Sequence, residues 1–294
     1  MNRALILGLL VLSVCAGVGH ADRGMITFKP NVQVFEPTQR AMIAWNGEEE
    51  LLVLSTDLRA SQATKVLEVL PLPAEPKVTK GDVEVFRKAT ALINRKMQER
   101  AKSRGRNVFG EAAEAPAGEI TFHEKIGTHD VSVARVISRD GFLDWVNGYL
   151  KKAGVDNPVV PQSIGTSVEE YLKEGFAWFV FDVVSLDEVP KTNEAVQYRF
   201  KTGSLFYPAK ISRTNSGETS IELLVLTPKL LRAFPGIPIA RVELRHPPVS
   251  ITAEELRSLN EDMDALLGHR GDMQLRIWRI RGEFSSFDKD LVAR

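Results

Sequence analysis

The stretch RAMIAWNGEEELLVLS, residues 40–55, contains the strongest fold signal in the chain. It consists of two largely apolar segments, residues 40–45 and 49–55, on either side of the dipeptide Asn46-Gly47. An Asn-Gly dipeptide tolerates the positive φ angles of a tight type I′ turn, and this turn joins neighbouring antiparallel strands. The stretch therefore predicts a β-hairpin.

Many strands and few helices are predicted beyond this hairpin. Apolar runs, alternation and turn residues predict strands at residues 66–70, 119–126, 130–137, 176–184, 196–201, 205–213, 219–227, 237–244 and 273–280, with a second hairpin between 205–213 and 219–227. Capping-box pairs and apolar residues at helical spacing predict helices at residues 79–104, 142–154, 167–175 and 252–268. This pattern predicts an α+β fold of mostly antiparallel sheets with about four helices packed on them.

A stretch without periodicity divides the mature chain into two regions. Residues 105–118 follow no helix or strand pattern, which predicts a linker or a long surface loop. Residues 22–104 form an N-terminal region of hairpin plus long helix, and residues 119–294 form a larger α+β region. The sequence leaves open whether the two regions fold separately or share one core.

Residues 1–21 have the three parts of a secretory signal peptide. A short positive start precedes the apolar run at residues 4–18, and small residues then lead to a cleavage site after Ala21. A membrane anchor is one alternative, although this run is short for a helix that must cross about 30 Å of hydrocarbon. A lipoprotein signal that ends at Cys15 is another. We expect cleavage, and therefore a periplasmic or extracellular protein.

Composition excludes several classes of protein. The 38 Lys and Arg residues balance the 38 Asp and Glu residues, which weighs against a nucleic-acid partner. The only cysteine, Cys15, lies in the predicted signal, so the mature protein has no cysteine nucleophile, metal ligand or disulfide. The mature chain also contains no second apolar run long enough for a transmembrane span.

Catalytic motifs are missing from the sequence. There is no nucleophile elbow, phosphate-binding loop or Ser-x-x-Lys motif. Asp57, His123 and Asp130 are weak catalytic candidates for a site assembled from distant residues, and Asp57 lies just after a strand, where catalytic residues often lie. Such residues are more often turn formers. Asp262 and Asp264 are interpreted as part of the solvated face of a helix.

Two histidines near the middle of the chain suggest a metal site at first sight. His123 and His129 would lie about 20 Å apart on one extended strand. A turn at Gly127-Thr128 would place His129 opposite Ile126 instead. Neither arrangement brings both imidazoles to one ion, so we expect no metal and no cofactor.

The strongest charge asymmetry lies in the predicted helix at residues 79–104. Between residues 87 and 106 every charged residue is basic except Glu99. Such a helix could dock on an anionic envelope surface. The alternative is a solvated face that is offset by downstream glutamates. The candidate anion-binding surface comprises Arg95, Lys96, Arg100, Lys102, Arg104 and Arg106.

Several short blocks combine aromatic residues, prolines and glycines in a distinctive order. They are Phe35-Glu36-Pro37, Ala44-Trp45-Asn46-Gly47, Leu52 to Asp57, Val69 to Pro73, Gly127 to Asp130, Gly141-Phe142, Tyr171-Leu172 and Tyr207-Pro208. In these blocks, over residues 24–230, the chain resembles an exported bacterial family known as domain of unknown function 2330. The resemblance implies export and a shared fold, and it implies no reaction, ligand or catalytic residue.

These observations favour an exported, non-enzymatic binding or structural protein of the envelope, whose partner is an unidentified protein or small ligand. One alternative is a periplasmic hydrolase whose site is assembled from distant residues. Another is a protein that binds anionic lipid or polymer through residues 87–106.

Overall fold

A computed structural model describes residues 24–35, 39–105, 130–189, 191–192, 195–215, 217–232 and 234–294. The predicted signal at residues 1–21 and the predicted strand at 119–126 lie outside the described residues. The predicted linker at 105–118 also lies outside them, apart from Gly105.

The larger sheet has ten strands in the described part of the chain. Its spatial order is β13 (Val242–Leu244), β15 (Met273–Glu283), β12 (Glu218–Thr227), β3 (Gln39–Trp45), β4 (Glu49–Ala60), β10 (Val196–Lys201) and β6 (Lys77–Lys80), with β14 (Val249–Ile251) beside β15 and both β2 (Val34–Phe35) and β9 (Lys191–Thr192) beside β4. The pairing of β12 with β3 is parallel, and every other pairing in this sheet is antiparallel.

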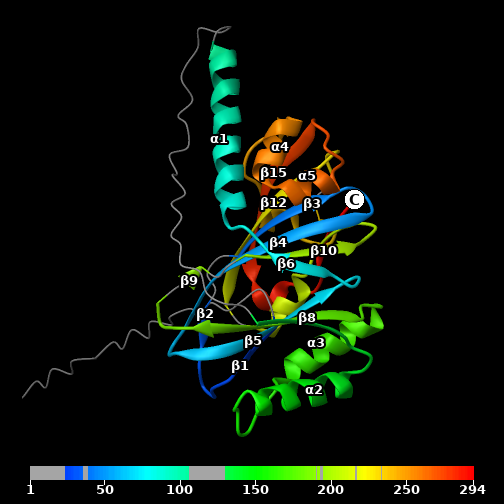
Figure 1. Ribbon diagram of the computed structural model, residues 1–294. Coiled ribbons are helices and arrows are strands. Elements are labelled where there is room, and N and C mark those ends of the chain that lie inside the picture. The colour runs from blue at the N-terminus through cyan, green and yellow to red at the C-terminus, as the bar shows by residue number, and fades with distance from the viewer. Residues whose placement is uncertain are drawn as a thin grey trace, which may run out of the picture.

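The smaller sheet lies beneath the larger one in the view of Figure 1. Its order is β1 (Gly24–Thr27), β5 (Thr64–Leu72), β8 (Trp178–Leu186) and β7 (Asp130–Arg135), and all its pairings are antiparallel. Two helices, α2 (Arg139–Lys152) and α3 (Gln162–Lys173), cover the face turned away from the larger sheet (Figure 1). A short pair, β11 (Leu205–Tyr207) with β16 (Leu291–Ala293), forms a third sheet.

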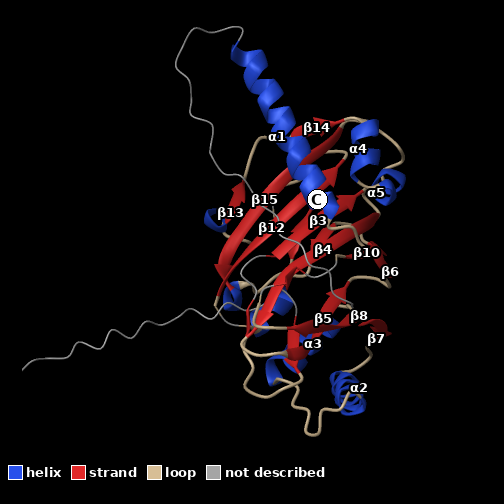
Figure 2. Cartoon of the chain, turned by 60° about the vertical axis from the view of Figure 1, so that its left-hand side comes forward, coloured by secondary structure: helices blue, strands red, loops and turns tan. Residues whose placement is uncertain are grey.

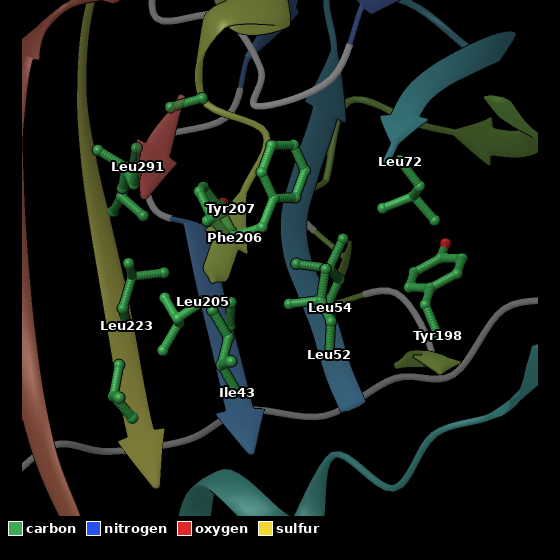
Figure 3. Packing of buried hydrophobic residues seen from close by; sticks show 14 of the residues in the cluster. Ile43, Leu52, Leu54, Leu72, Tyr198, Leu205, Phe206, Tyr207, Leu223 and Leu291 are labelled. Atoms are coloured by element: carbon green, nitrogen blue, oxygen red, sulfur yellow. The ribbon is translucent and has the colours of Figure 1, made fainter. Parts of the chain in front are cut away.

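The main hydrophobic core lies between the sheets. Figure 3 shows Ile43 of β3, Leu54 of β4 and Leu223 of β12 packed with side chains from β11 and β16. Leu72 of β5 reaches the same cluster (Figure 3). Strands from both sides of residues 105–118 therefore share one sheet and one core.

A second core covers the opposite face of the larger sheet. Helices α1 (Glu84–Gly105), α4 (Ala253–Leu259) and α5 (Glu261–Leu266) pack there against β3, β4, β12 and β15. The first half of α1 joins this core, and the helix then extends away from the sheets (Figures 1 and 2). The described residues also include the short 3₁₀ helices η1 (Lys210–Thr214), η2 (Ile239–Arg241) and η3 (Phe284–Ser286).

The structure confirms the α+β fold and the first hairpin. Trp45 pairs with Glu50 across the turn. Gly47 alone has a positive φ there, at 110°, while the Asn46 side chain accepts from the backbone N–H groups of Glu48 and Glu49 at 2.9 and 2.8 Å. The Asn-Gly signal was therefore right about the hairpin, although Asn46 acts through its side chain and not through a positive φ.

The second predicted hairpin is wrong. Residues 205–213 form only the short strand β11, which pairs with β16 and not with β12. Pro208 follows β11 directly and has no backbone N–H to continue a ladder, and η1 begins at Lys210. The strand predicted at 237–244 is likewise shortened to β13, which follows η2.

The capping-box pairs predicted from the sequence are Thr79 with Asp82, Ser167 with Glu170 and Thr252 with Glu255, and the first two are wrong. Thr79 lies in β6, and the Asp82 side chain instead accepts from Glu84 N at 2.9 Å where α1 begins. Ser167 lies inside α3 and is buried. The third box, formed by Thr252 and Glu255, is confirmed.

Within the part of the chain that the structure describes, no helix is both long enough and apolar enough to cross a membrane.

Candidate functional site

The cationic helix α1 has an inner half that packs on the fold and an outer half that does not. Ile93, at 3% exposure, is the last buried residue among those of α1 whose burial is described, and Lys96 and Met97 are half-buried. Residues 98–102 are all exposed. Residues 98–102 therefore present their side chains to solvent, and this part of the helix extends away from the sheets (Figure 2).

The inner half of α1 is fastened to α4 by an ion-pair cluster around one carboxylate. Glu255 Oε1 lies 2.6 Å from Arg95 Nη2 and 2.9 Å from Lys96 Nζ. Burial alone would raise the pKa of Glu255, but its backbone hydrogen bond from Thr252 and the two cations outweigh burial and hold that pKa below its usual value. Glu255 therefore competes with any external anion for Arg95 and Lys96.

A groove of about 720 Å³ runs between α1 and α4 beside this cluster. Arg87, Lys88 and Arg95 line it from α1, and Glu254 and Glu255 line it from α4. Arg87 is already paired with Glu84, and Lys88 Nζ lies 3.8 Å from Asp82 Oδ2. Because both signs of charge line the groove, its walls do not form a cationic channel.

The remaining candidate cations lie farther along α1. Arg100 and Lys102 are exposed, the side chain of Arg104 is not described, and Arg106 lies outside the described residues. Burial lowers the pKa of His246, and the charges of Arg100 and Arg245 lower it further. The charge of Arg100 on α1 therefore reaches the segment that contains Arg245 and His246.

Sequence reasoning missed Arg245 because nothing local links it to α1. Arg245 N donates to Ile277 O at 3.0 Å, and this bond holds the segment between β13 and β14 along β15. The sheet thereby places the neighbouring strand β14 against α1, which lies far away in the sequence, and the charge of Arg100 acts on His246. Only the strand order could have revealed this placement. We name Arg100, Lys102 and Arg245 the outer cationic surface.

The weak catalytic candidates are dispersed. Asp57 lies near the end of β4, where its side chain is not described, and His123 lies outside the described residues. Asp130 begins β7 in the smaller sheet, and its Oδ2 accepts from the Tyr149 hydroxyl at 3.3 Å. Burial and this neighbouring carboxylate raise the pKa of Tyr149. Asp57 and Asp130 therefore lie on different sheets.

One histidine–carboxylate pair was missed by the sequence reading. Asp264, interpreted as solvated, is 1% exposed, and its Oδ2 lies 2.7 Å from His269 Nδ1 and 3.2 Å from Arg257 Nε. Burial would raise the pKa of Asp264, but these two hydrogen bonds and charges hold it below its usual value. His269 N also donates to Asp264 O at 2.9 Å, so the pair closes the C-terminal end of α5.

The prediction that Asp264 lies on the solvated face is wrong, because the single helix predicted at 252–268 is in fact two helices, α4 and α5. Asn260 ends α4 and caps α5, and this break rotates the second helix relative to the first. The Asn260 capping signal could have indicated the break.

A buried carboxyl also lies in the main core. Glu50 is fully buried, and its Oε2 accepts from Phe206 N at 2.7 Å. Burial raises the pKa of Glu50 well above its usual value, despite this hydrogen bond. Glu50 thus anchors β11 to β4. Among the described residues, no three His, Cys, Asp or Glu side chains are grouped so that they could hold a metal ion.

Comparisons with known proteins place the chain in a bacterial context. The sequence model of a family described as uncharacterized proteins conserved in bacteria, DUF2330, matches residues 19–267. No curated protein matches the chain significantly. Among solved structures, the chain is similar to the crystal structure of baculovirus P35, with 9% sequence identity, a TM-score of 0.43, and coverage of 92% of this chain and 99% of that chain. A likeness at this level carries no argument about function.

Proposed function

The chain belongs to the bacterial family DUF2330, and on that premise we propose that it is an exported, non-enzymatic envelope protein that binds an anionic polymer through the outer cationic surface. Export is supported by the signal-peptide pattern of residues 1–21. The mature protein would then work in the periplasm or outside the cell.

The observation that carries the proposal is the extension of α1 beyond the fold. A helix segment that is polar all round gains nothing from packing, so it depends on i,i+4 pairs such as Arg95 with Glu99 and on the packed inner half. Residues 98–102 are all exposed, and Arg100 and Lys102 lie among them. Arg245 adds a further exposed cation from the body of the protein. The surface is thus accessible to a large partner.

A polymer fits this surface better than a bilayer. A helix that lies in a membrane interface buries an apolar face with Trp, Phe or Leu. The exposed segment Gln98-Glu99-Arg100-Ala101-Lys102 has no such face, and Met97 packs against the core of the larger sheet. Binding would therefore depend on charge alone, and added salt should weaken it steeply.

Binding of the purified mature protein to immobilised poly-L-glutamate and to phosphatidylglycerol vesicles tests the proposal. The variant R100E/K102E reverses two exposed charges, and K151E/K152E reverses two exposed charges at the end of α2 as a matched control. Since each cation near an anionic surface contributes about 1 kcal/mol, we expect R100E/K102E to weaken polymer binding by at least about tenfold.

The control variant should bind like the wild type, and the vesicles should bind only weakly. Equal loss of binding in both variants, or polymer binding that does not depend on salt, would overturn the proposal. Export is tested separately by intact-mass measurement of the protein from its own host, where a chain that retains residues 1–21 would contradict it.

A further inference from the structure

A charged cleft lies at the end of the larger sheet where its central strands diverge. The parallel pairing of β12 with β3 begins at Ile221 and Gln39, but β12 itself begins earlier, at Glu218. On the other side, β4 continues to Ala60, where it pairs with β2. The cleft lies between these ends and has a volume of about 840 Å³. This volume is within the range of small-ligand sites.

Three arginines from three different elements line the cleft. Arg59 of β4 lies over the ring of Phe35, its partner across the β2–β4 pair, at 4.4 Å from the centroid. Arg241, at the end of η2, donates through Nη1 to Ser286 Oγ at 2.5 Å. Arg281 of β15 is the third. The stacking and the hydrogen bond hold the first two guanidinium groups in place before any ligand arrives.

Two of these arginines have no acidic partner in the part of the chain that the structure describes. Arg59 and Arg241 make no ion pair there, and Arg281 Nη1 lies 3.7 Å from Glu243 Oε2. A guanidinium offers a fork of N–H donors that matches a carboxylate or phosphate, so unpaired arginines in a cleft favour an anionic group.

Two carboxylates line the same cleft. Glu218 and Glu283 are cross-strand partners on β12 and β15, and both are exposed. Like charges directly opposite each other on a sheet destabilise it. A cation placed between the two carboxylates would relieve this repulsion, whereas a purely anionic ligand would increase it.

We propose that this cleft binds a short acidic peptide with a free amino group, whose carboxylates are held by Arg59, Arg241 and Arg281 and whose ammonium lies between Glu218 and Glu283. The two signs of charge fit a zwitterionic ligand better than inorganic phosphate or a simple polycarboxylate. The backbone amides of such a peptide could also bond at the open strand ends. This site is separate from the outer cationic surface on α1 and does not depend on it.

Titration with triglutamate, its N-acetylated form and inorganic phosphate tests the proposal by calorimetry on the mature protein. We expect saturable binding of triglutamate, and binding at least about tenfold weaker for the N-acetylated form, which lacks the ammonium. R59Q/R241Q should lose triglutamate binding, whereas R270Q, which removes an exposed arginine elsewhere, should not change it.

The variant E218Q/E283Q gives an internal check, because it should change the affinities for the two peptides in opposite directions. It should weaken binding of triglutamate and strengthen binding of N-acetyltriglutamate, because the ammonium loses its partners while the repulsion of extra carboxylates falls. The proposal fails if phosphate binds as tightly as triglutamate, if acetylation has no effect, or if R59Q/R241Q binds like the wild type with an unchanged melting temperature.

Discussion

The hydroxyl of Tyr171 donates a 2.7 Å hydrogen bond to Asp290 Oδ1 and thereby joins α3 to the segment that leads into β16. The backbone N–H of Lys210 donates to the same oxygen at 2.8 Å. Lys210 Nζ lies 4.0 Å from the centre of the Tyr171 ring and pairs with Glu174 Oε2 at 2.5 Å. One carboxyl therefore connects α3, η1 and the segment before β16 at the C-terminal end of the chain.

This connection makes stability depend on pH. Burial raises the pKa of Asp290 from 3.8 to about 6, and the bonds from Tyr171 and Lys210 only partly oppose it. Since the folded-state pKa is raised, the contribution of Asp290 is fully present below about pH 4 and is lost as the pH rises through about 6. D290N keeps the accepting oxygen but cannot titrate there. Between pH 4 and pH 7 its free energy of unfolding should therefore fall by up to about 3 kcal/mol less than that of the wild type.

Urea denaturation at a series of pH values measures this difference. D288N is the matched control, because Asp288 is an exposed neighbour of the same type. Its stability should follow the wild-type pH dependence. If D290N follows that dependence as well, Asp290 does not titrate in this range.

Two glycines should respond in opposite directions to the same substitution. A Cβ at Gly81 would lie 2.9 Å from the backbone carbon and oxygen of Ala195, whereas a Cβ at Gly148 would meet nothing within 4 Å. Backbone atoms cannot move aside cheaply, so G81A should lower the free energy of unfolding by about 1–3 kcal/mol. Gly148 lies inside α2, where alanine is the better helix former, so G148A should raise it by about 0.5–1 kcal/mol.

Chemical denaturation of the two variants under the same conditions decides this prediction. A destabilised G148A, or a neutral G81A, would show that the packing around β6 or along α2 differs from that described.

Local signals predicted those elements whose residues determine their own conformation. The hairpin at Asn46-Gly47 and the capping box at Thr252 depend on neighbouring residues, and both were found. The pairing of β11 with β16 could not be predicted, because it joins segments far apart in the sequence. The same limit applied to the site, since strand order decides that the charge of Arg100 reaches His246, the neighbour of Arg245.

The break between α4 and α5 gives a test of a local signal that was overlooked. Asn260 Oδ1 accepts from Met263 N at 2.9 Å and so caps α5. Replacing a capping asparagine with alanine typically costs about 1 kcal/mol. We therefore expect N260A to lower the free energy of unfolding by about that amount.

The control for this capping variant is N147A. Asn147 lies inside α2, where the same substitution improves helix propensity. N147A should leave stability unchanged or slightly raised. Equal losses in both variants would mean that the cap of α5 contributes nothing specific.

The cluster around Glu255 links stability to the proposed polymer binding. Glu255 pairs with Arg95 and Lys96 and completes the capping box of α4, so it holds α1 against the body while it neutralises two of the cations. In E255Q the glutamine can still accept from Thr252 N, but the two cations lose their counterion. The partly exposed pairs contribute little, so stability should fall by about 0.5–1 kcal/mol.

The affinity of E255Q for the polymer should rise, although its stability falls. Because Arg95 and Lys96 become available to an external anion, E255Q should bind poly-L-glutamate more tightly than the wild type, by about threefold to tenfold at low salt. E254Q is the matched control, since Glu254 lies beside it on α4 and makes no ion pair with α1 in the described residues. A purely structural role for Glu255 predicts weaker binding or none, because a loosened α1 would present its charges less well. The sign of the change in affinity therefore separates the two roles.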